Sequence, residues 1–355
     1  MIKYIGSKRT LVPHIIALAN AVRSRTGAET VCDMFSGTTR VAQGLKRAGF
    51  GVTANDLASY SEMLALAYIE HDARASAEDI TAKLLHLNSL HGVDGYVTQT
   101  FCLEARYFQP DNGRRIDAIR AQIDRISESR VERAILLTSL LEAADRVDST
   151  TGLQMAYLKD WAPRSFQPLE LRLPVFIPGT GKALRLDANA LAAEMDPADI
   201  VYLDPPYNQH SYHSNYHIWE TLVRGDTPES YGVARKRVDC RTVKSAYNVK
   251  GRAWSTFESL VRTVPARHFI VSFNNEGYFA RDDIVALLES VVGEVAVVPV
   301  RFKRYVGAQI GIHNLRGEKV GSVSHLTNRE FLFVAGEGAT AIVDSATRSL
   351  TAAAG

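Results

Sequence analysis

The residues that most clearly suggest chemistry form one short turn, residues 204–207, with the sequence Asp-Pro-Pro-Tyr. An apolar strand predicted over 200–203 ends there. The two prolines, which have no free N–H, turn the chain out of the sheet at its carboxyl edge, where open α/β sheets bind ligands. The Asp204 carboxylate and a proline carbonyl can accept both hydrogens of an exocyclic amine, while the Tyr207 ring stacks on a planar base. A proline-rich strand exit with a surface tyrosine is the alternative interpretation.

A second group of residues suits a nucleotide-like cofactor. Residues 31–39, Val-Cys-Asp-Met-Phe-Ser-Gly-Thr-Thr, indicate a strand that ends in Asp33, a turn that contains Gly37 and the start of a helix. Such a turn at a helix N-terminus commonly binds a nucleotide, but without G-x-G-x-x-G a dinucleotide is disfavoured. Asp56 ends the next predicted strand, where an acid can bind ribose hydroxyls. For Asp56 alone, an Asn-Asp helix cap is the alternative.

These two turns need a parallel sheet to position them. The predicted elements at the start of the chain are a helix from about Arg9, a strand over 30–35, a helix over 40–48 and a strand over 50–54. Together they form a βαβ unit. Residues 63–173 lose strand character and carry isoleucines at helical spacing, with Asp111 or Asn112 placed to cap one helix. Strand and helix patterns return over 200–334, so six or seven strands divided by a helical block predict one doubly wound α/β domain with an insertion.

Prolines and composition set the expected domain boundaries. Four prolines between residues 163 and 178 punctuate the exit from the helical block. We therefore expect a discontinuous catalytic domain over 1–70 and 181–336 and a helical insertion over 71–180. The tail, 337–355, is rich in Ala, Thr and Gly, and we expect it to be flexible.

The composition excludes several classes of protein. The chain has 355 residues, 46% hydrophobic and 23% charged, which is neither a disordered nor a fibrous composition. Lys and Arg total 41 against 39 Asp and Glu, so any polyanion site must be local. Cys32, Cys102 and Cys240 suggest neither a disulfide framework nor a structural zinc site. The apolar stretch 11–22 is too short to span a bilayer, so we expect a cytoplasmic protein.

Three motifs and their order resemble one family. Residues 3–8, Lys-Tyr-Ile-Gly-Ser-Lys, look like the N-terminal motif of the Dam-like, alpha-group adenine-N6 DNA methyltransferases. Residues 33–37, Asp-Met-Phe-Ser-Gly, resemble the S-adenosylmethionine motif of that family, and 204–207 resembles its catalytic tetrapeptide. The resemblance extends from about Met1 to Val334. It implies a Rossmann-like class I S-adenosylmethionine-dependent methyltransferase sheet with an inserted helical target-recognition domain.

The resemblance also implies roles for individual residues. The catalytic residues would be Asp204, Pro205, Pro206 and Tyr207. The residues that would bind S-adenosylmethionine are Tyr4, Lys8, Asp33, Phe35, Gly37, Asp56 and Asp187. Asp187 lies in the sequence Arg-Leu-Asp-Ala-Asn, at the place where this family contacts the cofactor's adenine. The sequence departs from the family at Thr39, where many members have a second glycine. Because threonine tolerates positive φ poorly, this departure concerns cofactor affinity.

The implied reaction is a direct displacement. Asp204 and the Pro205 carbonyl would polarise the amine, so that its lone pair turns toward a sulfonium methyl group held in line. This requires no raised pKa at Asp204, because the proton of the amine can leave after methyl transfer. The base must flip out of duplex DNA, with Tyr207 as its stacking face. The implied function is site-specific methylation of double-stranded DNA in a restriction-modification system, with a cognate restriction endonuclease as partner and no role at a membrane.

Local charge suggests where DNA would bind. Residues 224–267 contain ten Lys and Arg against four Asp and Glu, a balance of +6. Tyr231, Tyr247 and Trp254 are interleaved with these charged residues. Such a stretch can hold phosphates and support an extruded base, and a solvated surface loop is the alternative. By family analogy, the helical insertion, with Tyr107, Arg114 and Arg115, is expected to read the base sequence.

Three histidines, His210, His213 and His217, follow the catalytic turn, and the last two have helical i, i+4 spacing. We expect them to contact the flipped base or phosphate rather than a metal, because no acidic or Cys ligand lies at useful spacing in the sequence. Residues 272–275, Ser-Phe-Asn-Asn, end another predicted strand. They suit either the floor of the pocket or a plain strand-to-loop turn.

Three other functions stay open. An RNA base (guanine-N2) methyltransferase can carry a similar turn, although the N-terminal motif and the long insertion argue against it. A DNA cytosine-N4 methyltransferase more often has Ser where this chain has Asp204. A silent DNA-binding protein that keeps the fold would have little use for an intact turn at 204–207.

Overall fold

The computed structural model describes residues 2–6, 8–74, 77–303, 312–313, 319–321 and 327–354. Among these residues the strands form a mostly parallel seven-stranded sheet in the order β3-β2-β1-β4-β7-β11-β8. This confirms the predicted α/β class and strand number. The chain divides into two compact units. The first unit comprises Met1–Ser7, Ser36–Ala188 and His210–Ser245, and the second unit comprises Lys8–Phe35, Asn189–Gln209 and Ala246–Gly355.

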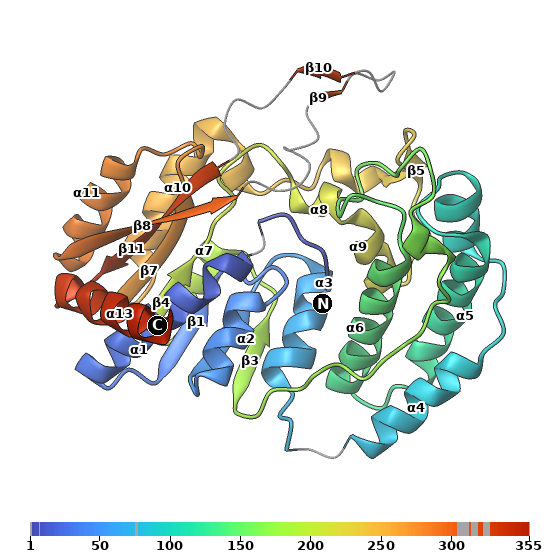
Figure 1. Cartoon of the computed structure of the whole chain (residues 1–355), viewed down its shortest axis with the longest axis horizontal. Helices are drawn as coiled ribbons and strands as arrows, with labels where there is room; N and C mark the ends of the chain where they lie inside the picture. The colour runs from blue at the N-terminus through green and yellow to red at the C-terminus, as the bar shows by residue number, and fades with distance from the viewer. Residues whose placement is uncertain are drawn as a thin grey trace. The chain divides into compact units, whose positions relative to one another are not determined.

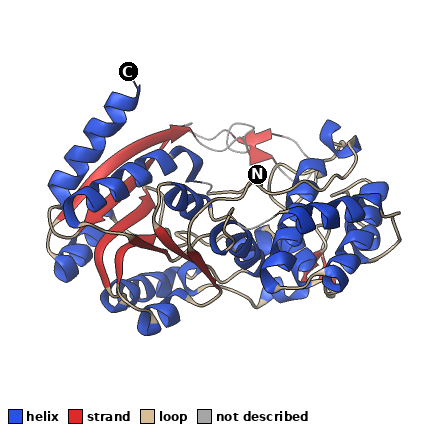
Figure 2. Cartoon of the chain, turned by 90° about the horizontal axis from the view of Figure 1, so that it is seen from below, coloured by secondary structure: helices blue, strands red, loops and turns tan. Residues whose placement is uncertain are grey.

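The second unit contains five strands of the sheet. They are β1 (Thr30–Asp33), β4 (Ala198–Leu203), β7 (Ala266–Asn274), β8 (Val295–Lys303) and β11 (Thr327–Ala335). β1, β4 and β7 are parallel, and β11 lies between β7 and β8 and is antiparallel to both. The central strand β7 is buried along nearly its whole length, as expected for a strand covered on both faces. Figure 2 shows helices on both sides of these strands.

Helices of the second unit cover this sheet. They are η1 (Lys8–Thr10), α1 (Val12–Thr26), α7 (Ala188–Glu194), η6 (Ala246–Asn248), α10 (Lys250–Thr263), α11 (Arg281–Val292) and α13 (Ala339–Ala354). α1 packs against α13, and α10 packs against α11 (Figure 1). The unit also contains the short antiparallel strands β9 (Ile312–His313) and β10 (Lys319–Gly321).

The first unit combines two parallel strands with most of the chain's central helices. The strands are β2 (Gly51–Asn55) and β3 (Gly181–Leu184), and a short hairpin is formed by β5 (Ser230–Tyr231) and β6 (Lys236–Arg237). The α-helices are α2 (Arg40–Arg47), α3 (Ser59–Ala65), α4 (Glu78–Ser89), α5 (Pro110–Ile126), α6 (Arg130–Val147), α8 (Tyr212–Asn215) and α9 (His217–Arg224). The other helical turns are η2 (Leu66–Glu70), η3 (Thr98–Leu103), η4 (Pro163–Phe166) and η5 (Val238–Arg241).

Most predicted elements occur within a few residues of their expected bounds, but three expectations need correction. Neither Asp111 nor Asn112 caps a helix, because α5 begins at Pro110 with Gln109 at its N-cap and no side-chain cap bond. The tail, expected to be flexible over 337–355, forms the helix α13 over Ala339–Ala354. Its apolar residues at helical spacing, Ala339, Ile342 and Ala346, are buried. The tail's small residues therefore concealed an amphipathic pattern.

The third correction concerns strand and helix patterns that the sequence did not reveal. β3 is short and half-polar, Gly-Lys-Ala-Leu, and α10 lies in the basic stretch expected to hold DNA. The compact units also divide the chain differently from the expected domains, because residues 36–70 and 210–245 group with the helices of the expected insertion. A separate target-recognition domain over 71–180 stays a prediction. No helix among the described residues is long and apolar enough to cross a membrane.

Candidate active site

In the second unit, the catalytic turn predicted from the sequence begins directly after β4. The carboxylate oxygen Oδ1 of Asp204 lies 2.9 Å from the ammonium nitrogen of Lys8. The Lys8 side chain is 7% exposed and that of Asp204 is 17% exposed. Within the described part of the chain, the second oxygen of Asp204, Oδ2, has no hydrogen-bond partner. One oxygen is therefore fixed by a cation while the other can accept a hydrogen from a ligand.

The Lys8 ammonium has a second carboxylate partner. It donates to Oε1 of Glu330 at 2.6 Å, and Glu330 is buried on β11. The hydroxyl of Ser272, also buried on β7, donates to the same oxygen at 2.7 Å. Ser272 was predicted at the end of a strand, in the pocket floor or in a plain turn, whereas Glu330 was not predicted. A lone acid in a strand pattern, 322 residues from Lys8, gives no local signal.

The environment of Asp204 raises its pKa to about 6. Burial contributes most, and the nearby charge of Glu330 adds to it, while the Lys8 ammonium acts in the opposite direction. The same two carboxylates raise the pKa of Lys8 well above its usual value despite the opposing effect of burial. The chemistry expected from the sequence needed no raised pKa at Asp204, so this is a property that the motif alone did not reveal.

Tyr207 lies on an aromatic base formed by β7 and the loop after it. Its ring packs edge-to-face against Phe273, with the ring centroids 5.5 Å apart, and Phe273 stacks on Phe279 at 5.0 Å. The Lys8 ammonium lies 5.6 Å from the centroid of the Tyr207 ring. The Tyr207 carbonyl accepts the backbone N–H of Tyr278 at 3.2 Å. The ring is thus supported from one side and remains half-buried.

Asp33 and Phe35 follow β1 in the same unit. Asp33 is 1% exposed, and Phe35 packs edge-to-face against Tyr247 with a centroid distance of 5.2 Å. The Tyr247 hydroxyl donates to Oδ1 of Asn189 at 2.7 Å. Tyr247, expected to contact DNA, is therefore buried beside a predicted cofactor residue instead.

In the first unit, a hydrogen bond joins Gly37 and Asp56, which were each predicted to bind the cofactor. The N–H of Gly37 donates to Oδ2 of Asp56 at 2.8 Å, and the N–H of Ala58 donates to Oδ1 at 3.0 Å. Burial raises the pKa of Asp56, although these backbone hydrogen bonds lower it. Gly37 has φ +50°, and a Cβ there would lie 3.3 Å from the Tyr4 ring. Only glycine allows this approach without strain.

Tyr4 belongs to an aromatic stack that the sequence did not predict. Its ring stacks on Tyr216 with a centroid distance of 4.5 Å and on Tyr212 at 5.3 Å. Tyr216 in turn stacks on Trp219 at 4.5 Å, and the hydroxyl oxygens of Tyr4 and Tyr60 are 3.2 Å apart. Burial raises the pKa of Tyr4 well above its usual value, so its hydroxyl stays protonated. The aromatic residues 212, 216 and 219 occur at helical spacing, which was the available signal.

Asp187 lies in an exposed turn after β3. The side chain of Asn55 pairs with the backbone of Leu186, donating to its carbonyl at 3.1 Å and accepting its N–H at 3.0 Å. Asn55 immediately precedes Asp56, so this pair of hydrogen bonds holds the turn that contains Asp187 at the end of β2. The structure thus brings Asp56 and the turn of Asp187 to one edge of the β2–β3 pair.

Thr39, in the predicted cofactor loop, has a positive φ of 60°. It is fully buried and forms the N-cap position of α2. Its hydroxyl donates to the Thr38 carbonyl at 2.7 Å and accepts from Nε2 of Gln43 at 3.0 Å. A β-branched residue at this φ is strained, so the local hydrogen bonds and burial must compensate.

Glu220, on α9, supports the turn between β2 and α3 that contains Asp56. Its carboxylate is buried and accepts the N–H groups of Ser59 and Tyr60, both at 3.2 Å, at the start of α3. Arg224 donates to Glu220 at 3.0 Å. Because α3 begins three residues after Asp56, this contact fixes the turn that carries Asp56. This contact was not predictable from the sequence, because Glu220 has the pattern of an ordinary helical acid.

The three histidines lie in different environments. His217 is buried, its Nε2 bonds with the Gln154 carbonyl at 2.8 Å, and burial lowers its pKa to about 3. Nε2 of His213 lies 3.0 Å from Oδ1 of Asp239. Cys240 is close to both, so the three side chains offer atoms of the kinds that bind metal ions. Thus folding brings His213 near acidic and Cys side chains, although sequence spacing had suggested otherwise. His210 is exposed.

Positive charge surrounds this His213 group. Arg237 donates to Asp239 with a shortest distance of 3.0 Å, and Arg224 donates to it at 3.1 Å. Although burial acts to raise it, Arg237 and His213 hold the pKa of Asp239 well below its usual range. Two guanidinium groups on the one carboxylate disfavour a divalent cation there.

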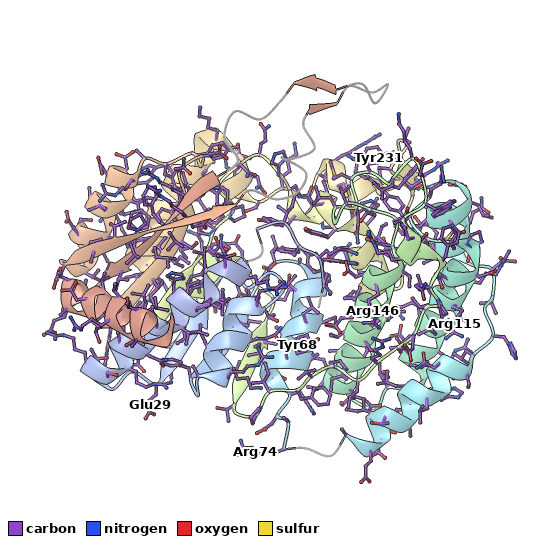
Figure 3. The ribbon with its side chains drawn as sticks, viewed as in Figure 1. Glu29, Tyr68, Arg74, Arg115, Arg146 and Tyr231 are labelled. Carbon is purple, nitrogen blue, oxygen red and sulfur yellow. The ribbon has the colours of Figure 1, made fainter. Side chains whose placement is uncertain are left out.

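The basic stretch 224–267 does not form one surface. Residues 224–245 belong to the first unit and 246–267 to the second. Arg237 is buried and donates to Asp226 and Asp239. Tyr231, on β5 (Figure 3), lies beside Lys236 and Arg241, whose charged groups are 5.3 and 4.2 Å from its ring centroid.

The residues expected to read DNA in the helical insertion are engaged within the protein. The Tyr107 hydroxyl is buried, and its oxygen lies 2.8 Å from the Gln154 carbonyl oxygen and 3.0 Å from that of Ala234, either of which can accept its hydrogen. Arg115, on α5 (Figure 3), donates to the carbonyls of Asn88 and Leu90. Arg114 pairs with Asp94 and Asp111. The contacts of Tyr107 and Arg115 support the fold, and those of Arg114 lie at the surface.

Comparison with known proteins adds an independent finding. The sequence model of the D12 class N6 adenine-specific DNA methyltransferases matches residues 4–274. The modification methylase StsI of Streptococcus sanguinis is 34% identical over 322 residues, which are 85% of this chain and 48% of that protein. The Type II methyltransferase M.NlaIII of Neisseria lactamica is 30% identical over 343 residues, which are 93% of this chain and 97% of that protein.

A third relative, the Type II methyltransferase M.FokI of Planomicrobium okeanokoites, is 31% identical over 306 residues, which are 81% of this chain and 47% of that protein. The chain therefore spans about half the length of StsI and M.FokI and nearly the whole length of M.NlaIII.

Proposed function

The chain belongs to the D12 class of N6 adenine-specific DNA methyltransferases, and from this membership we propose that it transfers a methyl group to N6 of adenine at a specific site in double-stranded DNA. The observation that carries the proposal is the pairing of Asp204 with Lys8 at the end of β4. It leaves one oxygen of a partly buried carboxylate ready to accept a hydrogen from the exocyclic amine. A purely structural turn would have no need of such a group.

We assign the catalytic turn the following roles. Oδ2 of Asp204 and the Pro205 carbonyl accept the two hydrogens of the amine, which turns its lone pair out of the base plane. Pro206 holds the turn rigid because its ring fixes φ. Tyr207, supported by Phe273, stacks on the base after it has flipped out of the duplex. Base flipping is part of the proposal because N6 is otherwise enclosed by stacked neighbours.

The proposed cofactor is S-adenosylmethionine, which would supply an electrophilic methyl group. The residues present fit it: Gly37 presents a turn without a side chain beside the Tyr4 ring, and Asp56 carries a carboxylate at a strand end. We assign Asp56 to the ribose hydroxyls and Asp187 to the adenine of the cofactor. Tyr4, Lys8, Asp33, Phe35 and Gly37 complete the proposed binding set.

The names of the relatives support a place in a restriction-modification system. StsI is a modification methylase, and M.NlaIII and M.FokI are Type II methyltransferases. We therefore propose that a restriction endonuclease acts on the same DNA site and that the enzyme works in the cytoplasm on chromosomal DNA. The exposed Lys244, Lys250 and Arg252, rather than the buried Arg237, are the better candidates for phosphate contacts.

The test is methyl transfer by the full chain. DNA from a host without adenine methylation is incubated with methyl-labelled S-adenosylmethionine, and the digested nucleosides are separated. We expect label in N6-methyladenine, none with Asp204→Ala, and full label with Asp282→Ala, which removes an acid that is 90% exposed on α11. Label in cytosine, or in RNA guanine when RNA is offered, would assign the chain to one of the alternative reactions. Cofactor binding without label in any nucleic acid would indicate a silent DNA-binding protein.

A further inference from the structure

Glu330 is a buried acid that the proposed chemistry does not yet use. It lies on β11, opposite Asn274 of β7 in the antiparallel ladder, and its side chain is 3% exposed. Acidic side chains are almost never this buried unless they are paired. β11 is the last of the sheet's strands along the chain, and it lies between β7 and β8. This position places Glu330 beside the segment that carries Lys8.

The contacts of Glu330 lead directly to the catalytic turn. Its Oε1 accepts Lys8 at 2.6 Å and Ser272 at 2.7 Å, and Lys8 lies 2.9 Å from Asp204. The ammonium group is therefore held between two carboxylates. One carboxylate is anchored on a central strand of the sheet, while the other belongs to a turn that must receive a substrate.

This arrangement is costly unless the charges serve a purpose. Two acids and one base, all largely removed from water, carry a net charge of −1 when ionised, and the desolvation of such groups is unfavourable. Apolar residues of similar size would close the same space at lower cost. An ion pair that served only to join β11 to η1 would need only Glu330 and Lys8. Here the Lys8 ammonium also pairs with Asp204.

We infer that Glu330, supported by Ser272, is a positioning residue for methyl transfer, which holds the Lys8 ammonium against Oδ1 of Asp204 and sets the charge that Asp204 experiences. The inference rests on the proposed function. Glu330 does not touch the base; it acts through Lys8. With Oδ1 fixed in this way, Oδ2 is the oxygen that remains for the amine.

The electrostatic consequence has a definite sign. The groups that titrate or carry charge around Asp204 are Lys8, Tyr202, Tyr207 and Glu330. Glu330 raises the pKa of Asp204 and Lys8 lowers it. Removing the charge of Glu330 therefore removes a repulsion and leaves Lys8 to Asp204 alone, so Asp204 should ionise at lower pH.

The deciding variant is Glu330→Gln, which keeps the shape and an acceptor oxygen. We expect kcat at pH 7.5, measured on DNA without adenine methylation, to fall about tenfold to a hundredfold because Lys8 is held less firmly. We expect the acid limb of the kcat–pH profile to move about one pH unit toward acid. The affinity for S-adenosylmethionine, measured by calorimetry, should change less than about twofold. Glu289→Gln, the same substitution at an exposed site on α11, should leave all three quantities unchanged.

Further variants separate the effect of the Glu330 charge from the effect of the length of its side chain. Glu330→Asp keeps the charge but shortens the side chain, so we expect kcat to fall while the acid limb stays in place. Ser272→Ala removes one hydrogen bond and no charge, and it should lower kcat severalfold with the acid limb unmoved. If Glu330→Gln does not fold, Ser272→Ala decides the question, because an unchanged kcat there would overturn the inference.

The outcomes distinguish this inference from the proposed function. If the unmodified enzyme does not methylate adenine, the proposed function fails first. If the enzyme is active and Glu330→Gln has the same kcat and acid limb, or loses activity only in step with thermal stability while the limb stays unmoved, Glu330 is merely structural and the inference is wrong.

Discussion

The backbone N–H of Gly37 donates to Oδ2 of Asp56 at 2.8 Å, which joins the turn after the first strand to the acid at the end of the second. One carboxylate thus organises a loop and, in the proposed function, binds the ribose of a cofactor. The Gly37 and Ala58 N–H groups bind different oxygens of this carboxylate. An amide has a single acceptor oxygen, so Asp56→Asn should weaken cofactor binding and also leave one of these two N–H groups without its acceptor.

We predict that Asp56→Asn weakens S-adenosylmethionine binding about tenfold to a hundredfold, since a hydrogen bond to a charged group contributes about 1.5–3 kcal/mol. Isothermal titration calorimetry measures the dissociation constant, and the melting temperature should fall modestly because one backbone N–H loses its acceptor. The matched control is Asp79→Asn at an exposed position of α4. Equal affinity in the Asp56 variant and the unmodified protein would refute the assignment.

Thr39 allows a prediction about backbone strain. In an ordinary helix Gly is less stable than Ala by about 0.5–1 kcal/mol, but at φ 60° a side chain costs about 1–2 kcal/mol. Thr39→Gly should therefore be more stable than Thr39→Ala by about 1 kcal/mol in the free energy of unfolding, measured by urea denaturation. The usual order, with the alanine variant more stable, would show that the loop relaxes in solution.

The fold near the site also depends on Glu220. Its buried carboxylate satisfies two N–H groups at the start of α3 and pairs with Arg224. We predict that Glu220→Ala lowers the free energy of unfolding by about 3 kcal/mol, because breaking a buried pair leaves unsatisfied donors. The control is Glu258→Ala, which breaks an exposed helical pair with Arg262 and should cost less than about 0.5 kcal/mol. Thermal and chemical denaturation of both variants compares them, and equal losses would contradict the prediction.

The parts of the site that follow from local sequence were predictable. A strand end followed by two prolines locates Asp204, and two successive strand ends locate Asp33 and Asp56, because each signal lies within a few residues. Glu330 was not predictable: it reaches Lys8 only through the insertion of β11 between two earlier strands. Glu220 is a similar case, since only the fold brings it to the start of α3.

Charge and composition were the least reliable guides. The stretch 224–267 has a balance of +6, yet Arg237 is buried with two acids and the stretch divides between the two compact units. Counting charges cannot reveal which are already neutralised. The tail was wrongly predicted to be flexible, because its many Ala and Thr residues obscure a helical face whose buried positions include Ile342.

The raised pKa of Asp204 predicts the pH dependence of the unmodified enzyme. An ionised carboxylate accepts a hydrogen from the amine, whereas a protonated one places its own hydrogen on the oxygen that must accept. We therefore expect kcat to rise with pH through about pH 6, where Asp204 loses its proton. Single-turnover rates between pH 5 and 8 measure this, with cofactor and DNA at saturation. A flat profile across pH 6 would show that Asp204 is already ionised throughout, or is not required.

Lys8→Met should move this acid limb in the direction opposite to Glu330→Gln. Methionine fills similar space without charge, so Asp204 and Glu330 would face each other with no cation between them, and the pKa of Asp204 should rise further. We expect the limb to shift about one pH unit or more toward alkaline pH and kcat to fall about a hundredfold. Lys182→Met, at an exposed position of β3, is the matched control and should leave the profile unchanged.

The same variant should also change how stability depends on pH. A carboxyl whose pKa in the folded protein lies above its unfolded value contributes stability that is full below the unfolded value, near 4, and is lost as pH rises through the folded value. That loss already occurs in the unmodified protein up to about pH 6; in Lys8→Met it should extend to higher pH. The difference in melting temperature between Lys8→Met and the unmodified protein should therefore be small at pH 5 and large at pH 8. A constant difference over this range would mean that Lys8 stabilises the fold without setting the charge of Asp204.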